Sequence, residues 1–136
     1  MRHGKLIGVL VILLVAVTFL GVVSAAEVTI GSEKFNIPDG YTEDTSQAKE
    51  KESSTGTTYV REYSDGKNKI IFNVNVFGGD ITGVKLNEEP GYENKTIKGI
   101  EGMYNSDTHS FHYATDNATV FISATGEGII EEFLIE

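Results

Sequence analysis

Two histidines in the second half of the chain, His109 and His112, have the side-chain type best suited to bind a metal ion or to transfer a proton. Phe111 and Tyr113 alternate around them, which is typical of a strand. Residues three apart on a strand point to opposite faces, so the two imidazoles are not expected to hold one ion together. The sequence therefore predicts no metal site and no cofactor here.

A loose acidic group, Asp80, Glu88, Glu89 and Glu93, surrounds a Pro-Gly pair. Calcium prefers carboxylates in a flexible loop. However, the spacing matches no EF-hand loop, and a solvated loop is the simpler interpretation. A carboxylate pair of the glycosidase kind depends on distance in space alone. A small secreted hydrolase with an acidic site therefore stays open as an alternative function.

Nucleophilic catalysis has little support in the sequence. Ser and Thr are plentiful, but no G-x-S-x-G elbow occurs, and 99–102 lacks the spacing and the lysine of a phosphate-binding loop. The chain has no Cys, which excludes a thiol nucleophile, a disulfide framework and a Cys-ligated metal. We therefore expect a protein that is not an enzyme.

Two sequons, Asn94-Lys95-Thr96 and Asn117-Ala118-Thr119, fit the acceptor pattern for N-glycosylation. The alternative is that each Asn is a turn residue that happens to precede a Thr. Asn117 falls in a predicted turn and is expected to be exposed.

The aromatic residues either line a sugar- or peptide-binding face or pack in and around the core. Tyr59 and Tyr63 share a face with Arg61, and that face is polar if Val60 points inward.

Residues 1–26 differ from the rest of the chain. Arg2 and Lys5 precede 18 uncharged residues, 6–23, and the small residues Ser24, Ala25 and Ala26 follow. This pattern predicts a signal peptide cleaved after Ala26. The apolar run also approaches the ~20 residues that span a bilayer, so a retained N-terminal hydrophobic helix is the alternative. Either way, the remainder is expected outside the cytoplasm, secreted or tethered to the membrane only through 1–26.

The part after Ala26 carries 9 basic and 20 acidic residues, a net charge of −11. Such a chain repels nucleic acid, so no nucleic-acid partner is expected. Its 110 residues suffice for one core without disulfides. We therefore expect a single extracytoplasmic domain over 27–136.

The elements that must position these residues are mostly strands. Residues 28–30 and 34–37 read as a hairpin around Gly31-Ser32. Residues 42–56 contain one Ala and no larger apolar side chain, which predicts a long exposed loop with at most a frayed helical turn. Residues 57–63 and 69–77 form a second hairpin, and in its return strand four apolar residues alternate with Asn73 and Asn75.

Further short runs follow at 81–86, 92–97, 100–105, 109–115 and 119–124. Asp116-Asn117 predicts a turn with positive φ at both residues. In 127–136 the apolar residues fall on one stripe, which predicts a C-terminal helix. The fold class expected is α+β, an antiparallel meander-like sheet of about six or seven strands with this helix packed on it.

Several phrases, IGSEKFNIPDGYTED, REYSDGKNKIIFNV and TIKGIEGMYN, together with the C-terminal helix, resemble small exported single-domain proteins of methanogenic archaea. The most specific part is 35–41. The resemblance implies an archaeal cell-envelope location and an unknown function, and it supplies no catalytic residue. Together these observations favour a non-enzymatic binding or envelope-associated module, whose partner is an unidentified protein or envelope component.

Overall fold

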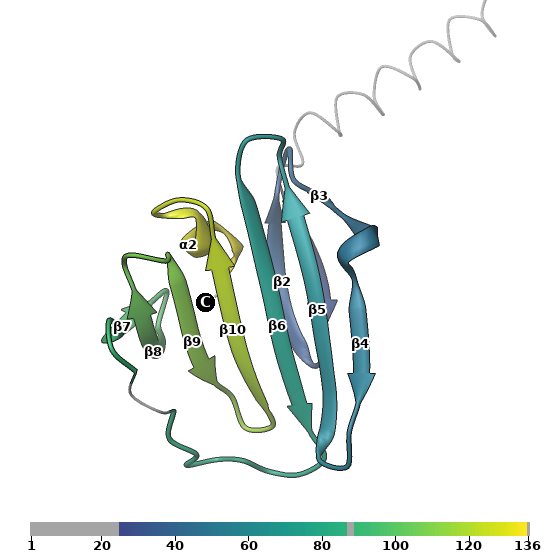
Figure 1. The fold of residues 1–136 in the computed structure, drawn as a ribbon, viewed down its shortest axis with the longest axis vertical. Coiled ribbons are helices and arrows are strands. Elements are labelled where there is room, and N and C mark those ends of the chain that lie inside the picture. The colour runs from purple at the N-terminus through teal and green to yellow at the C-terminus, as the bar shows by residue number, and fades with distance from the viewer. Residues whose placement is uncertain (1–24, 87–88, 136) are drawn as a thin grey trace, which may run out of the picture.

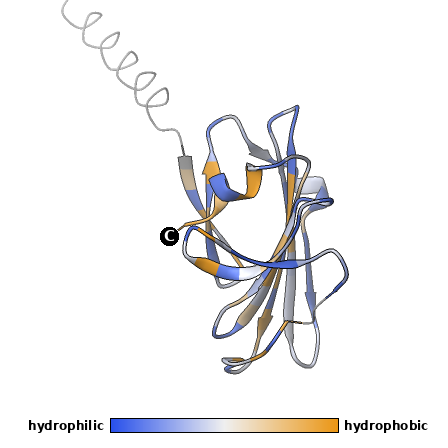
Figure 2. Ribbon diagram, turned by 90° about the vertical axis from the view of Figure 1, so that its left-hand side faces the viewer, coloured by the Kyte–Doolittle hydropathy of each residue, from blue (hydrophilic) through white to orange (hydrophobic). Residues whose placement is uncertain are grey.

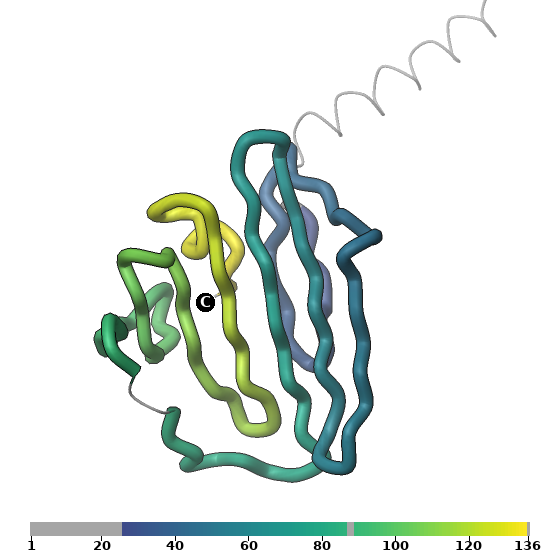
Figure 3. The backbone as a smooth tube through the Cα atoms, viewed as in Figure 1, coloured from purple at the N-terminus to yellow at the C-terminus, as the bar shows by residue number. Residues whose placement is uncertain are grey.

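The computed structural model describes residues 25–86 and 89–135, which form two layers (Figures 1 and 3). One layer is an antiparallel sheet of eight strands, and the other consists of a separate hairpin and a short C-terminal helix. The elements are β1 (Ala25–Ile30), β2 (Glu33–Pro38), β3 (Thr42–Glu43), the 3-10 helix η1 (Thr45–Gln47), β4 (Lys49–Glu52), β5 (Gly56–Ser64), β6 (Lys69–Phe77), β7 (Glu93–Ile97), β8 (Ile100–Asn105), β9 (Ser110–Ala114), β10 (Ala118–Ala124) and α2 (Ile129–Phe133). The expected antiparallel sheet with one C-terminal helix is present, and the helix is so short that the fold is mostly β.

The chain order and the order of strands in the sheet differ at one place. The strands lie in the order β3-β5-β6-β10-β9-β8-β7, and β4 pairs with β5 beside β3. After β6 the chain passes along the lower end of the sheet in Figure 1, begins β7 at the far edge, and returns so that β10 pairs with β6. Backbone bonds from Gly78 N to Thr55 O (3.1 Å) and from Ile81 N to Asp116 O (2.7 Å) hold the crossing segment at that end. The predicted meander is thus interrupted once, and 81–86 is irregular.

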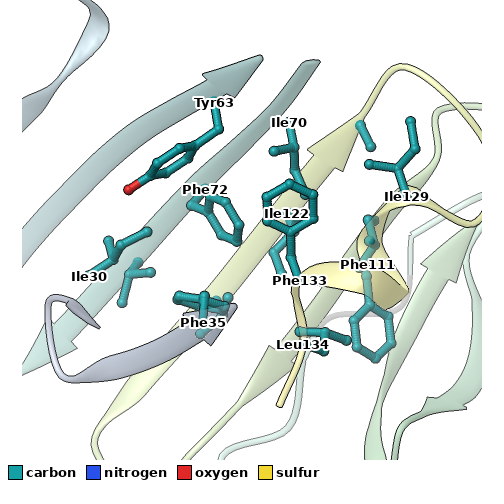
Figure 4. Close-up of a cluster of buried hydrophobic side chains, with 14 of the residues drawn as sticks. Ile30, Phe35, Tyr63, Ile70, Phe72, Phe111, Ile122, Ile129, Phe133 and Leu134 are labelled. Atoms are coloured by element: carbon teal, nitrogen blue, oxygen red, sulfur yellow. The ribbon is translucent and has the colours of Figure 1, made fainter. Parts of the chain in front are cut away.

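The core lies between the two layers. Ile70, Phe72 and Val74 of β6 are fully buried, as the alternating pattern predicts. The Phe72 ring lies against Phe35 of the hairpin and Phe133 of α2, with ring centroids 4.6 and 5.8 Å apart (Figure 4). The hairpin and the helix therefore cover the same face of the sheet, and Figure 2 shows both on one side of it.

The β1–β2 hairpin turns at Gly31, as predicted, but it forms a sheet of its own instead of joining the main one. Gly31 has a φ of +63°, and a Cβ atom there would lie 2.7 Å from Val76 Cγ2 and 3.0 Å from Tyr59 Cδ1. Only glycine fits this close approach without displacing its neighbours. The hairpin starts at Ala25, which pairs with Pro38, and continues with Ala26 opposite Ile37.

The expectation of a long loop over 42–56 was wrong. This segment contains β3, η1 and β4, and both strands pair with β5. Asp44 caps η1 by accepting a bond from Ser46 N (3.1 Å), and its own N–H donates to Glu62 O (2.8 Å). An edge strand with all four residues exposed, like β4, needs no apolar side chains, because backbone pairing with β5 orders it. A composition argument based on burial misses this source of order.

Two local expectations also changed. The turn at 116–117 exists, but among the described residues only Lys98 and His109 have a positive φ without being glycine. Thr115 closes this turn instead, through its backbone N–H to Ala118 O (2.8 Å) and its Oγ1, which accepts from Ala118 N (3.2 Å). The C-terminal helix spans five residues rather than ten, although its apolar stripe is buried as predicted.

The predicted leader, apart from Ala25 and Ala26, lies outside the described residues. In the part of the chain that the structure describes, no helix is long and apolar enough to span a bilayer.

Candidate functional site

The candidate site is the face of the sheet opposite the hairpin and α2, called the open face below. Strand register determines which side chains share it, because cross-strand partners point to the same side. The central part of one row of such partners consists of Val60, Asn73, Phe121, His112 and Met103, and Lys49 of β4 and Asn94 of β7 continue it at the two edges. The five central residues are all half-buried. The open face thus presents two rings, an amide and a thioether in one line.

A second row runs beside the first and is linked by hydrogen bonds. Thr58 Oγ1 donates to Asn75 Oδ1 (2.6 Å), and Asn75 Nδ2 donates to Thr119 Oγ1 (3.3 Å). Asn73 lies two residues before Asn75 on the same face, but its side-chain oxygen is not part of this hydrogen-bonded row. Its Oδ1 atom is buried and has no hydrogen-bond partner among the described residues. A buried unpaired amide oxygen costs about 1–3 kcal/mol, so the open face carries a polar group that the fold itself leaves unused.

The centre of the open face has no charged side chain. After Lys69 at the start of β6, the outward residues of β6, β10 and β9 are Ile71, Asn73, Asn75, Phe77, Thr119, Phe121, Ser123, Ser110, His112 and Ala114. Charges occur at the margins, for example Glu62 with Lys69 (3.6 Å). In a chain with 20 acidic residues this leaves a neutral strip about three strands wide.

His112 belongs to this neutral strip. Burial lowers its pKa below the ordinary value, and the carboxylate of Glu89 offsets part of that shift. The imidazole is therefore uncharged at neutral pH. Its ring meets Phe121 at 70°, with centroids 5.7 Å apart, so the two rings fix each other's orientation.

The two histidines do not come together. His109 lies in the turn before β9 with a φ of +51°, and its buried Nδ1 has no partner among the described residues. His112 points to the open face. Within 25–86 and 89–135, no group of three or more His, Asp or Glu residues could hold a metal ion. Of the acidic group, Asp80 accepts a bond from Thr82 N (2.8 Å), the exposed Glu89 and Glu93 line one hollow beside Pro90, and Glu88 lies outside the described residues.

The condition for a polar face around Arg61, an inward Val60, is not met. Tyr59, Arg61 and Tyr63 do share a face, but their partners in β6 are buried core residues, so this is the covered face and Val60 points outward. Arg61 sits at its rim, between β3 and β4. Its guanidinium pairs with Glu50 (2.7 Å) and Glu43 (3.9 Å) and donates to Lys49 O (3.1 Å). The arginine therefore fastens the edge strands and is not a free binding group.

Hollows occur near the β7–β8 hairpin. One, of about 610 Å³, opens beside its outward side and includes Lys85, Asn94 and Met103. A smaller one, of about 230 Å³, lies between the hairpin and α2, where Lys95 Nζ stands 4.4 Å from the centroid of the Tyr104 ring. One acidic residue, Glu101, lines the larger hollow, whereas Glu127 and Glu131 line the smaller one together with Lys95 and Lys98. These charges of opposite sign offset one another, and we take the neutral strip as the candidate site.

The sequons differ in exposure. Asn94 is exposed on β7, whereas Asn117 is half-buried in the β9–β10 turn, contrary to the expectation for it.

Comparison of the chain with protein-family models, with curated proteins and with solved structures finds no match. The sequence anticipated that Asn73 and Asn75 point away from the core. It missed their alignment with Phe121 and His112, because that depends on β10 inserting between β6 and β9.

Proposed function

We propose that this chain is a non-enzymatic extracytoplasmic domain that binds a neutral glycan of the cell envelope through the open face of its sheet. The observation that carries the proposal is the uncharged strip over β6, β10 and β9 in an otherwise acidic protein. The leader pattern in 1–26 and the resemblance to exported archaeal proteins support the location.

The side chains of the strip favour a sugar over a protein as ligand. The Ser123 hydroxyl, and the Asn73 amide once its side chain turns toward solvent, can hydrogen-bond to sugar hydroxyls, and the half-exposed ring of Phe121 offers a surface for the apolar face of a pyranose. A protein interface of ordinary size has an apolar core. Among the described residues, the exposed large hydrophobic side chains are Ile71 and Val84, which is too little for such a core.

Charge also favours a neutral ligand. The part after Ala26 has a net charge of −11, and an anionic polymer would be repelled as it approached. The central strip offers no lysine or arginine to neutralise it. A neutral glycan avoids this repulsion.

The test is co-sedimentation of the full chain with envelope fractions from its native host. One portion is treated with protease and another with periodate, which cleaves vicinal diols of sugars. Binding that survives protease and is lost after periodate is the expected result. Loss after protease alone would identify a protein partner and overturn the proposal, as would the absence of binding to any fraction.

Variants locate the site. We expect Phe121→Ala to weaken binding roughly tenfold or more, because a central aromatic contact is worth about 1–2 kcal/mol or more. Val84→Ala is the matched control, since it removes an exposed apolar side chain outside the sheet. Equal effects of the two variants would exclude the open face as the binding site.

A further inference from the structure

The two sequons occupy different structural environments, and we propose that Asn94, and not Asn117, is an N-glycosylation site of the folded protein. The proposal rests on the export part of the proposed function, because the transferases that attach N-glycans work outside the cytoplasm. It does not depend on the glycan-binding part.

The sequon at Asn94 is open along its whole length. It lies in β7, an edge strand whose sheet partner among the described strands is β8 alone. Asn94, Lys95 and Thr96 are all exposed. The register places Asn94 opposite Met103 and Thr96 opposite Glu101, so both side chains of the sequon point to the same side. An enzyme that reads Asn and Thr together can therefore approach without moving another strand.

The sequon at Asn117 is built into the centre of the sheet. The Asn117 carbonyl accepts a bond from Phe77 N (2.8 Å), and Ala118 has no exposed surface. Thr119 Oγ1 accepts from Asn75 Nδ2 (3.3 Å) and belongs to β10, which is paired on both sides. Reading this sequon requires opening β10 from β6, which amounts to unfolding much of the sheet.

The chemistry needs one co-reactant, an oligosaccharide carried on a polyprenyl phosphate. The amide nitrogen of Asn94 attacks the anomeric carbon of the sugar. A C–N bond forms, the C–O bond to the phosphate breaks, and the lipid phosphate leaves with the electron pair. The amide nitrogen loses one proton to a base of the transferase, and nothing is oxidised or reduced.

A glycan at this position stands beside the neutral strip instead of over it. Asn94 is opposite Met103, which is opposite His112, which in turn is opposite Phe121. Three strand spacings separate Asn94 from Phe121, about 14 Å. The sugar would cover the unpaired edge of β7 and hinder the addition of a foreign strand there.

The decisive experiment compares the folded and the urea-unfolded full chain as substrates of a single-subunit oligosaccharyltransferase with a lipid-linked oligosaccharide. Peptide mass spectrometry reads the occupancy of both sites, and Asn94→Gln and Asn117→Gln serve as matched single-site variants. We expect the folded chain to be modified at Asn94 at least tenfold faster than at Asn117, and the unfolded chain to be modified at both. Comparable modification of Asn117 in the folded chain, or none at Asn94, overturns the proposal.

A second measurement separates this inference from export. Intact mass of the protein from its native envelope should show sugar on the peptide containing Asn94. An unmodified protein recovered from the cytoplasm would refute the export on which both proposals rest, whereas an exported protein that lacks sugar at Asn94 would refute this inference alone.

Discussion

The two faces of the sheet carry different kinds of side chains. On the covered face, Phe72, Val120 and Ile122 have no exposed surface and are packed under the hairpin and α2. On the open face, the same strands carry Asn73, Phe121 and Ser123, all half-buried. Each strand thus contributes to the core with one side, and its other side is available for the binding proposed above. The difference shows that strand alternation can separate buried side chains from accessible ones within a single strand.

The largest expected effect comes from truncating one aromatic ring on each face of the sheet and comparing the losses of stability. Phe72→Ala should lower the free energy of unfolding by about 3–5 kcal/mol, because it leaves a cavity among Phe35, Tyr63 and Phe133. Phe121→Ala should cost less than half as much, since its ring is already half-exposed. Denaturant unfolding measures both. Equal losses would mean that the open face is as much a part of the core as the covered one.

One added methyl group at the tip of the β1–β2 hairpin should disturb the packing of this hairpin on the covered face. Gly31→Ala should destabilise by about 1–3 kcal/mol, because the new Cβ meets Val76 and Tyr59 in addition to the strain of a positive φ. Gly66→Ala is the control, since Gly66 also has a positive φ (+93°) but no atom within 4 Å of the added Cβ. If both variants lost the same stability in thermal unfolding, close packing of the hairpin tip would contribute nothing.

On the open face, we expect one substitution that raises the free energy of unfolding or leaves it unchanged. Asn73→Val removes the amide oxygen that has no partner and introduces a β-branched residue, which strands favour, in mid-strand. We expect unfolding free energy to stay the same or rise by about 1 kcal/mol, while binding to the envelope fraction weakens. A marked loss of stability would show that the Asn73 side chain supports the fold and is not reserved for a ligand.

The smallest effect concerns pH. Burial holds the pKa of folded His112 below the ordinary 6.5, so the unfolded chain binds a proton more readily than the folded one. The stabilisation that depends on neutral His112 is complete above the unfolded-state pKa and is lost as pH falls through the lower folded-state pKa. Urea unfolding of the wild type and of His112→Gln at pH 7.5 and 5 should give a smaller acid loss in the variant. A larger loss in the variant, or an NMR titration of His112 above 6.5, would contradict this.

The sequence predicts most strands but only part of their arrangement. Alternation in 69–77 predicted which side of β6 is buried, since burial acts on single residues. The environment of Arg61 could not be assigned from the sequence, because it depends on how β3 and β4 flank this residue, and those strands consist of polar residues ordered by backbone pairing. The row of side chains on the open face could not be predicted from the sequence for a similar reason. His112 and Phe121 become neighbours of Asn73 through the insertion of β10, a long-range pairing that no local pattern encodes.

The first pairs of the β1–β2 hairpin bear on the order of events during biogenesis. Ala25 and Ala26 pair with Pro38 and Ile37 in the hairpin, so the peptide bond after Ala26 lies inside β1. If the leader is cleaved after Ala26, as the sequence predicts, the peptidase needs that stretch extended and unpaired. Cleavage would then have to come before the hairpin closes, or compete with its closing, and β1 would begin two pairs later than it does here.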